Sequence, residues 1–583
     1  MKPRLLTLVS IVAGLAAVLA APAPAQARDI STAGALLDTK SGDVRLTADI
    51  KIDTAWHIDG NMTLDLNGHS IDRGLADDES RRKGSVLYLE EGSRLTLKDS
   101  GPTEDVLDST GKVVGHAYTG AITGGWGWYD AGGIECEKNC SIYMYGGNIT
   151  GNHTSENGGG IALAKGCKFY MYDGQINQNV AAKVADWRSC GYGGGIYAVD
   201  AEVHIEGGSI ENNKTDSDHR GGGIYAKDSS IEISGGLIQG NRAQSGGGVF
   251  YYADKSKAFK MSGGSIEKNV AEQDGGGIDI DGAAKITGGR IAGNRAKIGA
   301  GAYVEYTPLK SSPTVELGKV TICDNTASGQ GGGLYSGAVS VVMDGSTVSN
   351  NTASQGGGIY VSGLSSLFPA RFTLEDGTVT QNSATGGASA LWVSNSFDTV
   401  TVRGGHIVDN NPKRSGATSA ACPAVSGSSA DANTGSIDID ARRELEICEN
   451  RGGNLGAIRS GVWVKRLLPS TRIGVTGAIS FLSKTLTFGT VSRDYASEAD
   501  RLLGCFFPDD SSMVVSKAGN EYRLEMASTG ALDGGTVRVT AATVESYPSQ
   551  DQERAVFQKS FVTGGKEDAS RSWSFIPDTY IDR

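Results

Sequence analysis

The run GGGIYAKDSSIEISGGLIQGN at residues 221–241 carries the pattern on which the fold of this chain depends. The pattern returns at residues 246–269 as GGGVFYYADKSKAFKMSGGSIEKN, with a glycine triplet, a short alternating run, a Gly-Gly pair and a closing Asn in the same order. Further copies extend from about residue 132 to residue 410. Repeats of about 20–50 residues built from short strands are typical of solenoids, so we expect each repeat to form one coil.

Each repeat closes on an asparagine, and successive closing asparagines are 25 to 34 residues apart. The three short runs between the Gly and Asn corners alternate apolar and polar residues, and none is long enough for a helix. Three strands per coil, stacked in register, predict an all-β fold, a right-handed parallel β-helix. We expect each corner Asn to adopt left-handed backbone geometry and to bond through its amide to the coils above and below. The predicted corner residues are Asn152, Asn179, Asn213, Asn241, Asn269, Asn294, Asn325, Asn351, Asn382 and Asn410.

The first residues have the features of an export signal. Lys2 and Arg4 precede an apolar run that ends at a small-residue cleavage motif, Ala-Gln-Ala. Residues 1–27 are therefore predicted to be a signal peptide that is cleaved near Ala27. No later stretch is both apolar and long enough to span a bilayer, so we expect the mature chain to be secreted or held at the cell surface.

After the signal peptide, the chain divides into three predicted regions, of which only the middle one contains the repeat. Residues 28–131 hold strand-like runs without Gly triplets and are predicted to form an N-terminal cap and the first coils, because a solenoid end must be covered. The repeat β-helix is predicted over residues 132–460, and residues 461–583 are predicted to form a small β-rich C-terminal region.

Charge and cysteine content narrow the class of protein. The formal net charge of -12 argues against a nucleic-acid-binding surface, which needs a basic stripe. All eight Cys follow the predicted signal peptide, which suits an oxidising compartment. Cys140 and Cys167 each stand 12 residues before their corner Asn, so equivalent positions in successive coils place them about 4.8 Å apart. A disulfide between them is predicted, with two stacked, buried free thiols as the alternative.

An aromatic residue follows the glycine triplet and its β-branched neighbour in most coils. If the β-branched residue faces inward, strand alternation places the aromatic ring outside, in a ladder that rises about 4.8 Å per coil. Such rings can stack on sugar rings, so the ladder is a candidate glycan-binding face. The favoured alternative is that the rings stack on one another and stiffen the sheet. The aromatic ladder comprises Tyr197, Tyr225, Phe250, Tyr303, Tyr335 and Tyr360, and Asp279 interrupts it.

The pairing of Gly-Gly-Gly-Ile with Ile-x-x-Asn resembles the right-handed parallel β-helix proteins of the pectin-lyase-like superfamily. It is most similar to the surface branch with repeated Gly-Gly-x-Ile and Phe-x-x-Asn motifs, as in chlamydial polymorphic membrane proteins. The first motif stands at residues 158–161, 275–278 and 356–359, and the second, with Ile for Phe, at residues 291–294. The resemblance covers roughly residues 30–460 and implies a β-helix displayed at a surface; a fold of this kind hosts many activities.

Polysaccharide cleavage is the enzymatic alternative for a secreted β-helix. Hydrolysis needs two or three carboxylates that converge on one face, and a lyase needs a basic residue beside a carboxylate-rich Ca²⁺ site. Asp279 and Asp281 alternate onto one strand face with Lys285 in the next run, a pattern that is more typical of a solvated strand. The seven His show no metal-ligand spacing. We therefore assign no catalytic residue and expect no metal and no cofactor.

The sequence thus predicts a secreted or cell-surface, non-catalytic β-helix protein of adhesin type, whose partners are glycans or surface proteins. A carbohydrate-active enzyme, either a polysaccharide lyase or a glycoside hydrolase, is the first alternative. It would be distinguished by three acidic residues converging on one sheet face. A structural surface protein without a ligand is the second alternative.

Overall fold

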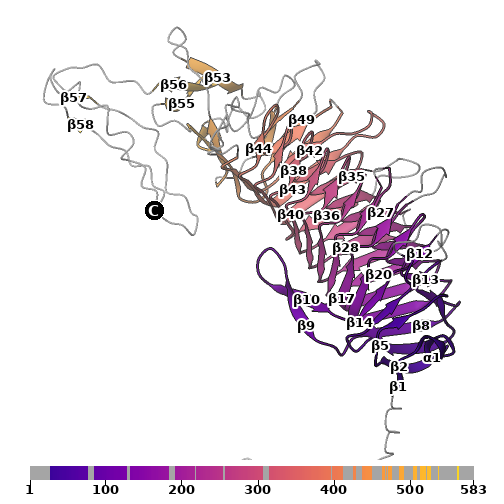
Figure 1. Ribbon diagram of the computed structural model, residues 1–583. Helices are drawn as coiled ribbons and strands as arrows, with labels where there is room; N and C mark the ends of the chain where they lie inside the picture. The colour runs from indigo at the N-terminus through magenta and orange to yellow at the C-terminus, as the bar shows by residue number, and fades with distance from the viewer. Residues whose placement is uncertain are drawn as a thin grey trace, which may run out of the picture.

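The structure is a computed structural model, and its chain winds into an elongated solenoid (Figure 1). It describes residues 27–75, 84–127, 131–182, 191–216, 218–253, 257–305, 314–395 and 397–410, and shorter stretches from there to residue 562. The predicted signal peptide lies outside the described residues apart from Ala27. The solenoid has about 12 turns and is nearly all β, which confirms the predicted parallel β-helix.

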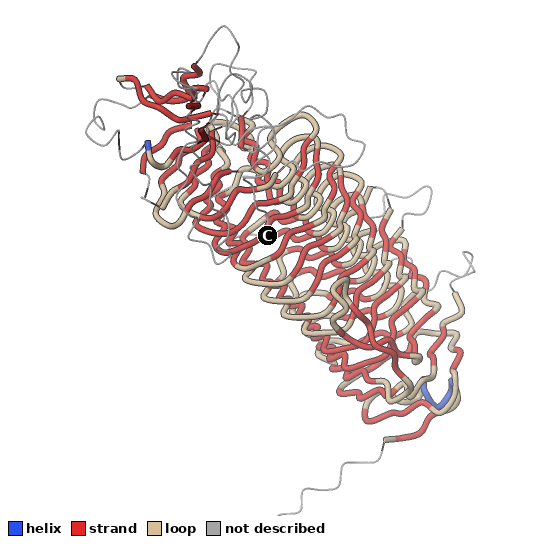
Figure 2. The backbone as a smooth tube through the Cα atoms, turned by 90° about the vertical axis from the view of Figure 1, so that its left-hand side faces the viewer, coloured by secondary structure: helices blue, strands red, loops and turns tan. Residues whose placement is uncertain are grey.

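Most coils contribute strands to three parallel sheets, which form three faces of the solenoid; sheet A is the longest and extends beyond the other two at both ends (Figure 2). Sheet B extends from β4 (Trp56–Ile58) to β48 (Val425–Gly427), and sheet C from β12 (Trp126–Gly127) to β44 (Ser383–Ala384). Sheet A receives two strands from a typical coil, on either side of a Gly-Gly bend. The coil of residues 221–243 contains β23 (Ile224–Lys227), β24 (Ser230–Ile233), β25 (Leu237–Gln239) and β26 (Arg242–Ala243).

Strand alternation fills the interior of the coils with apolar side chains. Ile224, Ile231, Ile233 and Ile238 are each 0–1% exposed, and each pairs in register with a buried residue of the next coil. Because the same positions repeat in every coil, the buried residues form one continuous core along the axis. Each coil is therefore stabilised by the two coils that it contacts.

Glycine is needed where neighbouring coils approach at the start of sheet B. Gly221 has a φ of 71°, in the left-handed region that residues with a side chain rarely adopt. A Cβ on Gly222 would lie 2.5 Å from the carbonyl oxygen of Gly247, and a Cβ on Gly223 would lie 2.6 Å from that of Gly248. The triplets thus allow the backbones of successive coils to approach closely.

The corner asparagines form a ladder of side-chain amides inside the solenoid. All ten are 0% exposed. The Oδ1 of Asn269 accepts hydrogen bonds from the backbone N–H and the Nδ2 of Asn241, and its Nδ2 donates to the carbonyl of Ile238 and to Oδ1 of Asn294. Equivalent bonds join each corner Asn from Asn152 onward to the next.

The expectation of left-handed geometry at these asparagines is wrong by one residue. The positive φ belongs to the residue before each of them, which makes the bend and leaves the Asn side chain free to enter the ladder. These preceding residues are Gly151, Gln178, Asn212, Gly240, Lys268, Gly293, Asp324, Asn350, Gln381 and Asp409.

A short helix lies at the N-terminal end of the solenoid, where β1 (Arg28–Ile30) begins sheet A (Figure 1). The helix α1 (Ala33–Leu37) is capped by the hydroxyl of Thr32, which accepts from the N–H of Ala35, and it buries Leu36 in the core. In the described part of the chain, no helix has the length and apolar character needed to cross a membrane.

Sheet A continues beyond residue 460, the predicted end of the repeats. The strands β51 (Val462–Arg466), β52 (Arg472–Val475) and β54 (Phe506–Pro508) extend it in parallel register. Next to them, β53 (Thr485–Thr490), β55 (Met513–Ala518) and β56 (Glu521–Met526) form a three-stranded antiparallel sheet. The C-terminal region is thus partly a continuation of the solenoid.

A β-hairpin leaves the first coils and lies along the outside of sheet A (Figure 1). Its strands are β9 (Thr103–Leu107) and β10 (Val113–Tyr118), which pair antiparallel. The carbonyl of Val114 accepts from the N–H of Gly208, and His116 contacts Asp173 at 2.5 Å. The hairpin therefore crosses the Gly-Gly bends of several coils.

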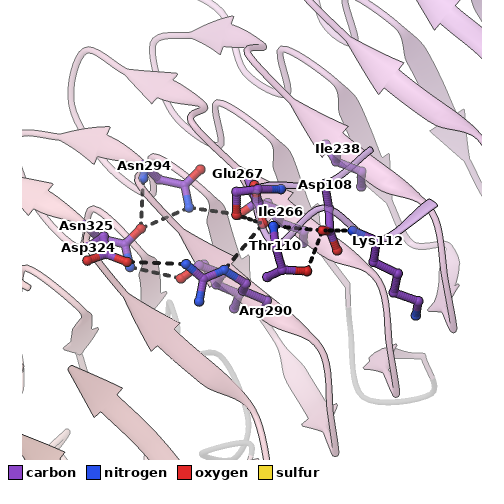
Figure 3. Close-up of polar contacts among 12 residues, drawn as sticks. Asp108, Thr110, Lys112, Ile238, Ile266, Glu267, Arg290, Asn294, Asp324 and Asn325 are labelled. Atoms are coloured by element: carbon purple, nitrogen blue, oxygen red, sulfur yellow. Dashed lines mark hydrogen bonds and ion pairs between the residues drawn. The ribbon is translucent and has the colours of Figure 1, made fainter. Parts of the chain in front are cut away.

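The tip of the hairpin docks on a buried glutamate that is 158 residues away in the sequence. Glu267 is 1% exposed and accepts from both the backbone N–H and the Oγ of Ser109. Arg290 lies 3.4 Å from Glu267 and 3.3 Å from Asp324 (Figure 3). The buried glutamate therefore has two partners, Ser109 and Arg290. The turn itself is closed by Asp108, which accepts from Thr110 and Lys112.

Candidate binding faces of the solenoid

The aromatic ladder runs along the outer side of sheet B. Tyr225 stacks on Phe250 with ring centroids 5.3 Å apart, and on Tyr197 with centroids 5.4 Å apart. Beyond the interruption, Tyr335 stacks on Tyr303 at 4.8 Å and on Tyr360 at 5.4 Å. The structure thus brings all six predicted ladder residues into two stacks.

Most of the ladder is covered. Tyr225, Phe250 and Tyr360 are 9%, 4% and 6% exposed, and the other three rings are partly buried. Within each stack the central ring, Tyr225 or Tyr335, has a neighbouring ring on both sides, and each end ring has one, with interplanar angles of 7° to 15°. Since a sugar stacks on a ring face, this arrangement favours the stiffening role over glycan binding at the ladder.

The same register position holds further aromatic residues beyond both ends of the ladder, although Glu135 and Ala162 occupy it in the two coils between Tyr88 and Tyr197. His57 and Tyr88 occupy it before the ladder, with ring centroids 4.9 Å apart, and Trp392 pairs in register with Tyr360. Tyr88 and His57 lie before the first Gly triplet, and Trp392 follows the sequence Gly-Ala-Ser-Ala-Leu instead of a triplet. The glycine-based pattern therefore missed them.

An acidic cluster fills the break in the ladder between Phe250 and Tyr303. Asp279, in β31 (Ile278–Asp281), is 6% exposed and interacts electrostatically with Asp274, Asp281 and Glu305. The guanidinium of Arg220 lies 4.8 Å from the centroid of the Phe250 ring. Its positive charge attracts the carboxylate form of Asp279 and partly offsets the repulsion from the acids. Three acidic side chains besides Asp279 thus converge on this part of the outer face of sheet B.

Burial controls the protonation of this acidic cluster. Desolvation, reinforced by the nearby Asp274, raises the pKa of Asp279 well above its ordinary value. Burial followed by repulsion from Glu305 also raises the pKa of Asp274. Burial and a hydrogen bond to Glu305 raise the pKa of the Tyr303 hydroxyl. A carboxyl group held in its protonated form can donate a proton to a substrate.

Lys285 lies away from this cluster. It belongs to β32 (Ala283–Ile286) of sheet A and pairs with Glu316 at 2.9 Å. Asp279 and Asp281 therefore do not share a face with the lysine that sequence spacing had placed near them. Among the described residues, no group of His, Cys, Asp and Glu side chains is arranged to hold a metal ion.

A second set of aromatic rings lies on the outer face of sheet A, on β14 (Ser141–Thr150) and β17 (Lys168–Asn177). Their rings stack in two short columns, with centroids 5.1 Å and 4.7 Å apart. Arg94 and His204 stack on the two ends of the first column, at 4.2 Å and 4.6 Å from the nearest ring. We call this group, Tyr143, Tyr145, Tyr170 and Tyr172, the tyrosine cluster.

The tyrosine cluster is more accessible than the ladder. Tyr145 is 48% exposed and the other three rings are partly exposed. Lys168 and Glu202, 3.2 Å apart, add polar groups beside it. The repeated Tyr-Met-Tyr sequence was visible in the chain, but it occurs in only two coils and so carried no periodic signal.

Cys140 and Cys167 occupy equivalent positions, directly before the register pair of Ser141 and Lys168. Both are buried free thiols, as is Cys136. The Sγ of Cys167 donates to the carbonyl of Glu137 at 2.7 Å, and a hydrogen bond with Cys136 together with burial raises the pKa of Cys167 to about 12. The disulfide between Cys140 and Cys167 stays a prediction.

Two segments on the C-terminal half of the solenoid are similar to a known repeat. Residues 319–337 and 345–362 match the Chlamydia polymorphic membrane protein repeat. No match was found among curated proteins or solved structures. Together with the parallel solenoid, these repeats fit a β-helix surface protein similar to polymorphic outer membrane proteins.

Proposed function

We propose that this chain, whose repeats are similar to those of polymorphic membrane proteins, is displayed at the cell surface as an adhesin-type rod that binds glycans. The repeat match is the observation that carries the surface assignment. The solenoid supports it physically, because a stack of coils with one continuous core is a stiff scaffold for presenting loops and side chains.

The tyrosine cluster is the surface that best suits a glycan. Binding sites combine aromatic area with a few polar groups that fix orientation. Tyr145, which stacks on Tyr172, is 48% exposed. The other column of the cluster, Tyr143 and Tyr170, lies near Lys168, which pairs with Glu202. By contrast, Tyr225, Phe250 and Tyr360 of the ladder are at most 9% exposed, and every ladder ring stacks on at least one other.

The test uses the chain from Arg28 to Arg583 and a panel of pectins, host glycans and bacterial wall polysaccharides. We expect retained binding to at least one class, with affinity at least about tenfold weaker in the double variant Tyr145→Ser/Tyr172→Ser. Leu107→Ser, at an exposed site on the hairpin, is the control and is expected to bind as the wild type does. Equal binding by the double variant and the wild type would contradict the assignment of the site.

A carbohydrate-active enzyme is the second candidate, and the acidic cluster at the ladder break favours it. Several carboxyl groups meet there, and Asp279 has the raised pKa of a proton donor. If the cluster is catalytic, the same panel releases reducing or unsaturated ends, and Asp279→Asn abolishes that release. Release that persists in Asp279→Asn, or no release from any polysaccharide, argues against catalysis at this cluster.

A further inference from the structure

One loop presents three apolar side chains to solvent at its tip. It connects β42 (Ile359–Val361) in sheet B to β43 (Arg371–Thr380) in sheet A. At its tip, Leu367 is 82% exposed, Leu364 53% and Phe368 36%. Exposed apolar groups gathered in this way are typical of an interaction site, because isolated ones are common but clusters are not.

The tip is a closed turn. The N–H of Leu364 donates to the carbonyl of Phe368 at 3.1 Å, and the N–H of Phe368 donates to the carbonyl of Ser365 at 2.9 Å. Ser365 and Phe368 also form an antiparallel bridge. Because these bonds fix the backbone, the three apolar side chains are held outside the solenoid.

A buried carboxylate holds the base of the loop. Asp398 is 1% exposed and accepts from the N–H groups of Gly363, Ala370 and Asn395, at 2.9 to 3.2 Å. The side chain of Asn395 donates to the carbonyl of Gly363 at 2.9 Å. Both ends of the loop are thus tied to the turn of the next coil, and a preorganised loop binds with a smaller entropic cost.

We infer that this apolar tip inserts into the interfacial region of a lipid bilayer. Three side chains of one turn cover far less than the roughly 1,200 Å² that a specific protein complex buries. A bilayer needs no matching pocket, and apolar side chains enter it at a gain that scales with their buried area.

Charge decides which lipid surface suits the tip. The residues from Gly363 to Ala370 carry no charged side chain, and the whole chain has a formal net charge of -12. Anionic lipids would repel such a chain. We therefore expect insertion into zwitterionic phosphatidylcholine bilayers, with binding that persists at high salt because screening acts on charges only. This inference is independent of glycan binding, since phosphatidylcholine carries no sugar.

The test is sedimentation of the chain from Arg28 to Arg583 with phosphatidylcholine vesicles. The expected result is binding that weakens at least about tenfold in the variant Leu364→Ser/Leu367→Ser/Phe368→Ser. The matched control, Leu107→Ser/Val113→Ser, removes an exposed apolar pair from the hairpin and is expected to change binding less than about twofold. Absent binding by the wild type, or equal losses in both variants, would overturn the inference.

A second measurement reports insertion directly. Leu367→Trp places a fluorophore at the most exposed position of the tip. Its emission, taken as the difference from the wild type, is expected to shift to the blue and intensify when phosphatidylcholine vesicles are added. An unshifted emission would overturn the inference. So would a wild-type dimer in sedimentation velocity that the triple serine variant abolishes, because the partner would then be a second copy of the chain.

Discussion

The corner asparagines show how much one side chain contributes when its position repeats. Asn269 alone satisfies two N–H groups of Asn241 and the carbonyl of Ile238, all inside the solenoid. A buried polar group without a partner costs about 1–3 kcal/mol, and no water reaches these groups through a packed core. The ladder therefore couples each corner to the corners on both sides.

Replacing one corner residue tests this coupling. Asn269→Ala leaves the N–H groups of Asn241 and the carbonyl of Ile238 without their partner. We expect the free energy of unfolding to fall by roughly 2–5 kcal/mol, measured by denaturant titration. Asn61→Ala, at an exposed position in β5 (Asn61–Asp65), is the control and is expected to change it by less than about 0.5 kcal/mol. Similar effects of the two variants would contradict a special role for the ladder.

Asp279 makes stability depend on pH. Its pKa in the folded chain is raised, because burial disfavours the charged form and Asp274 adds repulsion. The folded chain therefore holds the proton more tightly than the unfolded chain, so this residue destabilises the fold as pH rises from its ordinary pKa through the raised one. Asn cannot ionise. We expect Asp279→Asn to melt at a higher temperature than the wild type at pH 8, with the difference shrinking toward pH 4. A difference that does not vary with pH would contradict this account.

At the scale of elements, the aromatic ladder joins strands of successive coils. Tyr225 stacks on Phe250, Tyr197 and Tyr192 and is 9% exposed, so its removal creates a cavity and loses three ring contacts. We expect Tyr225→Ser to lower the free energy of unfolding by roughly 2–4 kcal/mol. Tyr145→Ser, with one close stacking partner and 48% exposure, is expected to lower it by less than about 1 kcal/mol. Equal losses would mean that stacking in the ladder adds little to stability.

The tip of the hairpin depends on a contact between residues that are far apart in the sequence. Its tip is held by the hydrogen bonds between Ser109 and the buried Glu267. Glu267→Ala removes both, so we expect trypsin to cleave after Lys112, near the tip, several-fold faster than in the wild type, as followed by mass spectrometry. Glu232→Ala changes an exposed glutamate of the same sheet and is the control. Unchanged cleavage in Glu267→Ala would show that other contacts hold the hairpin.

Sequence periodicity predicted the features that are specified by a short residue pattern and recur in most coils. The Gly triplets, the inward Ile positions and the ladder rings recur in most coils, so their places could be read from spacing alone. The bend residue was misplaced because two adjacent positions both suit a turn, as at Asn212 and Asn213. Only the hydrogen bonds of Asn213 to Asn241 distinguish them.

Contacts between parts of the chain that are far apart in the sequence produce no repeating pattern from which they could be predicted. The docking of Ser109 on Glu267 joins an unrepeated segment to a repeat, and nothing local to either residue indicates the other. Likewise, Glu305 reaches Asp279 from the next coil, and Asp398 supports a loop that begins at Gly363. These contacts follow from stacking of the coils, which fixes the neighbours of each residue only once the register is known.

At the scale of the whole molecule, the solenoid is a sum of similar coils, which implies that its length can change in steps of one coil. Thr326 pairs in register with Thr352, and the corner residues Asn325 and Asn351 are 26 residues apart. Deleting residues 326–351 therefore removes one complete turn. It brings Asn325 onto Asn382, the corner that now stacks on Asn351.

We expect this deletion variant to fold, with a β-rich circular dichroism spectrum, one cooperative melt and a maximum dimension about 4.8 Å shorter in X-ray scattering. Deleting residues 326–338 is the control. It removes part of a turn, so the strands that follow would meet the wrong sheets, and their inward side chains would lose the core. We expect that variant to be unfolded or aggregated. If both variants fold equally well, register between coils does not determine the structure; if neither folds, the coils are not the independent, nearest-neighbour units that the repeats imply.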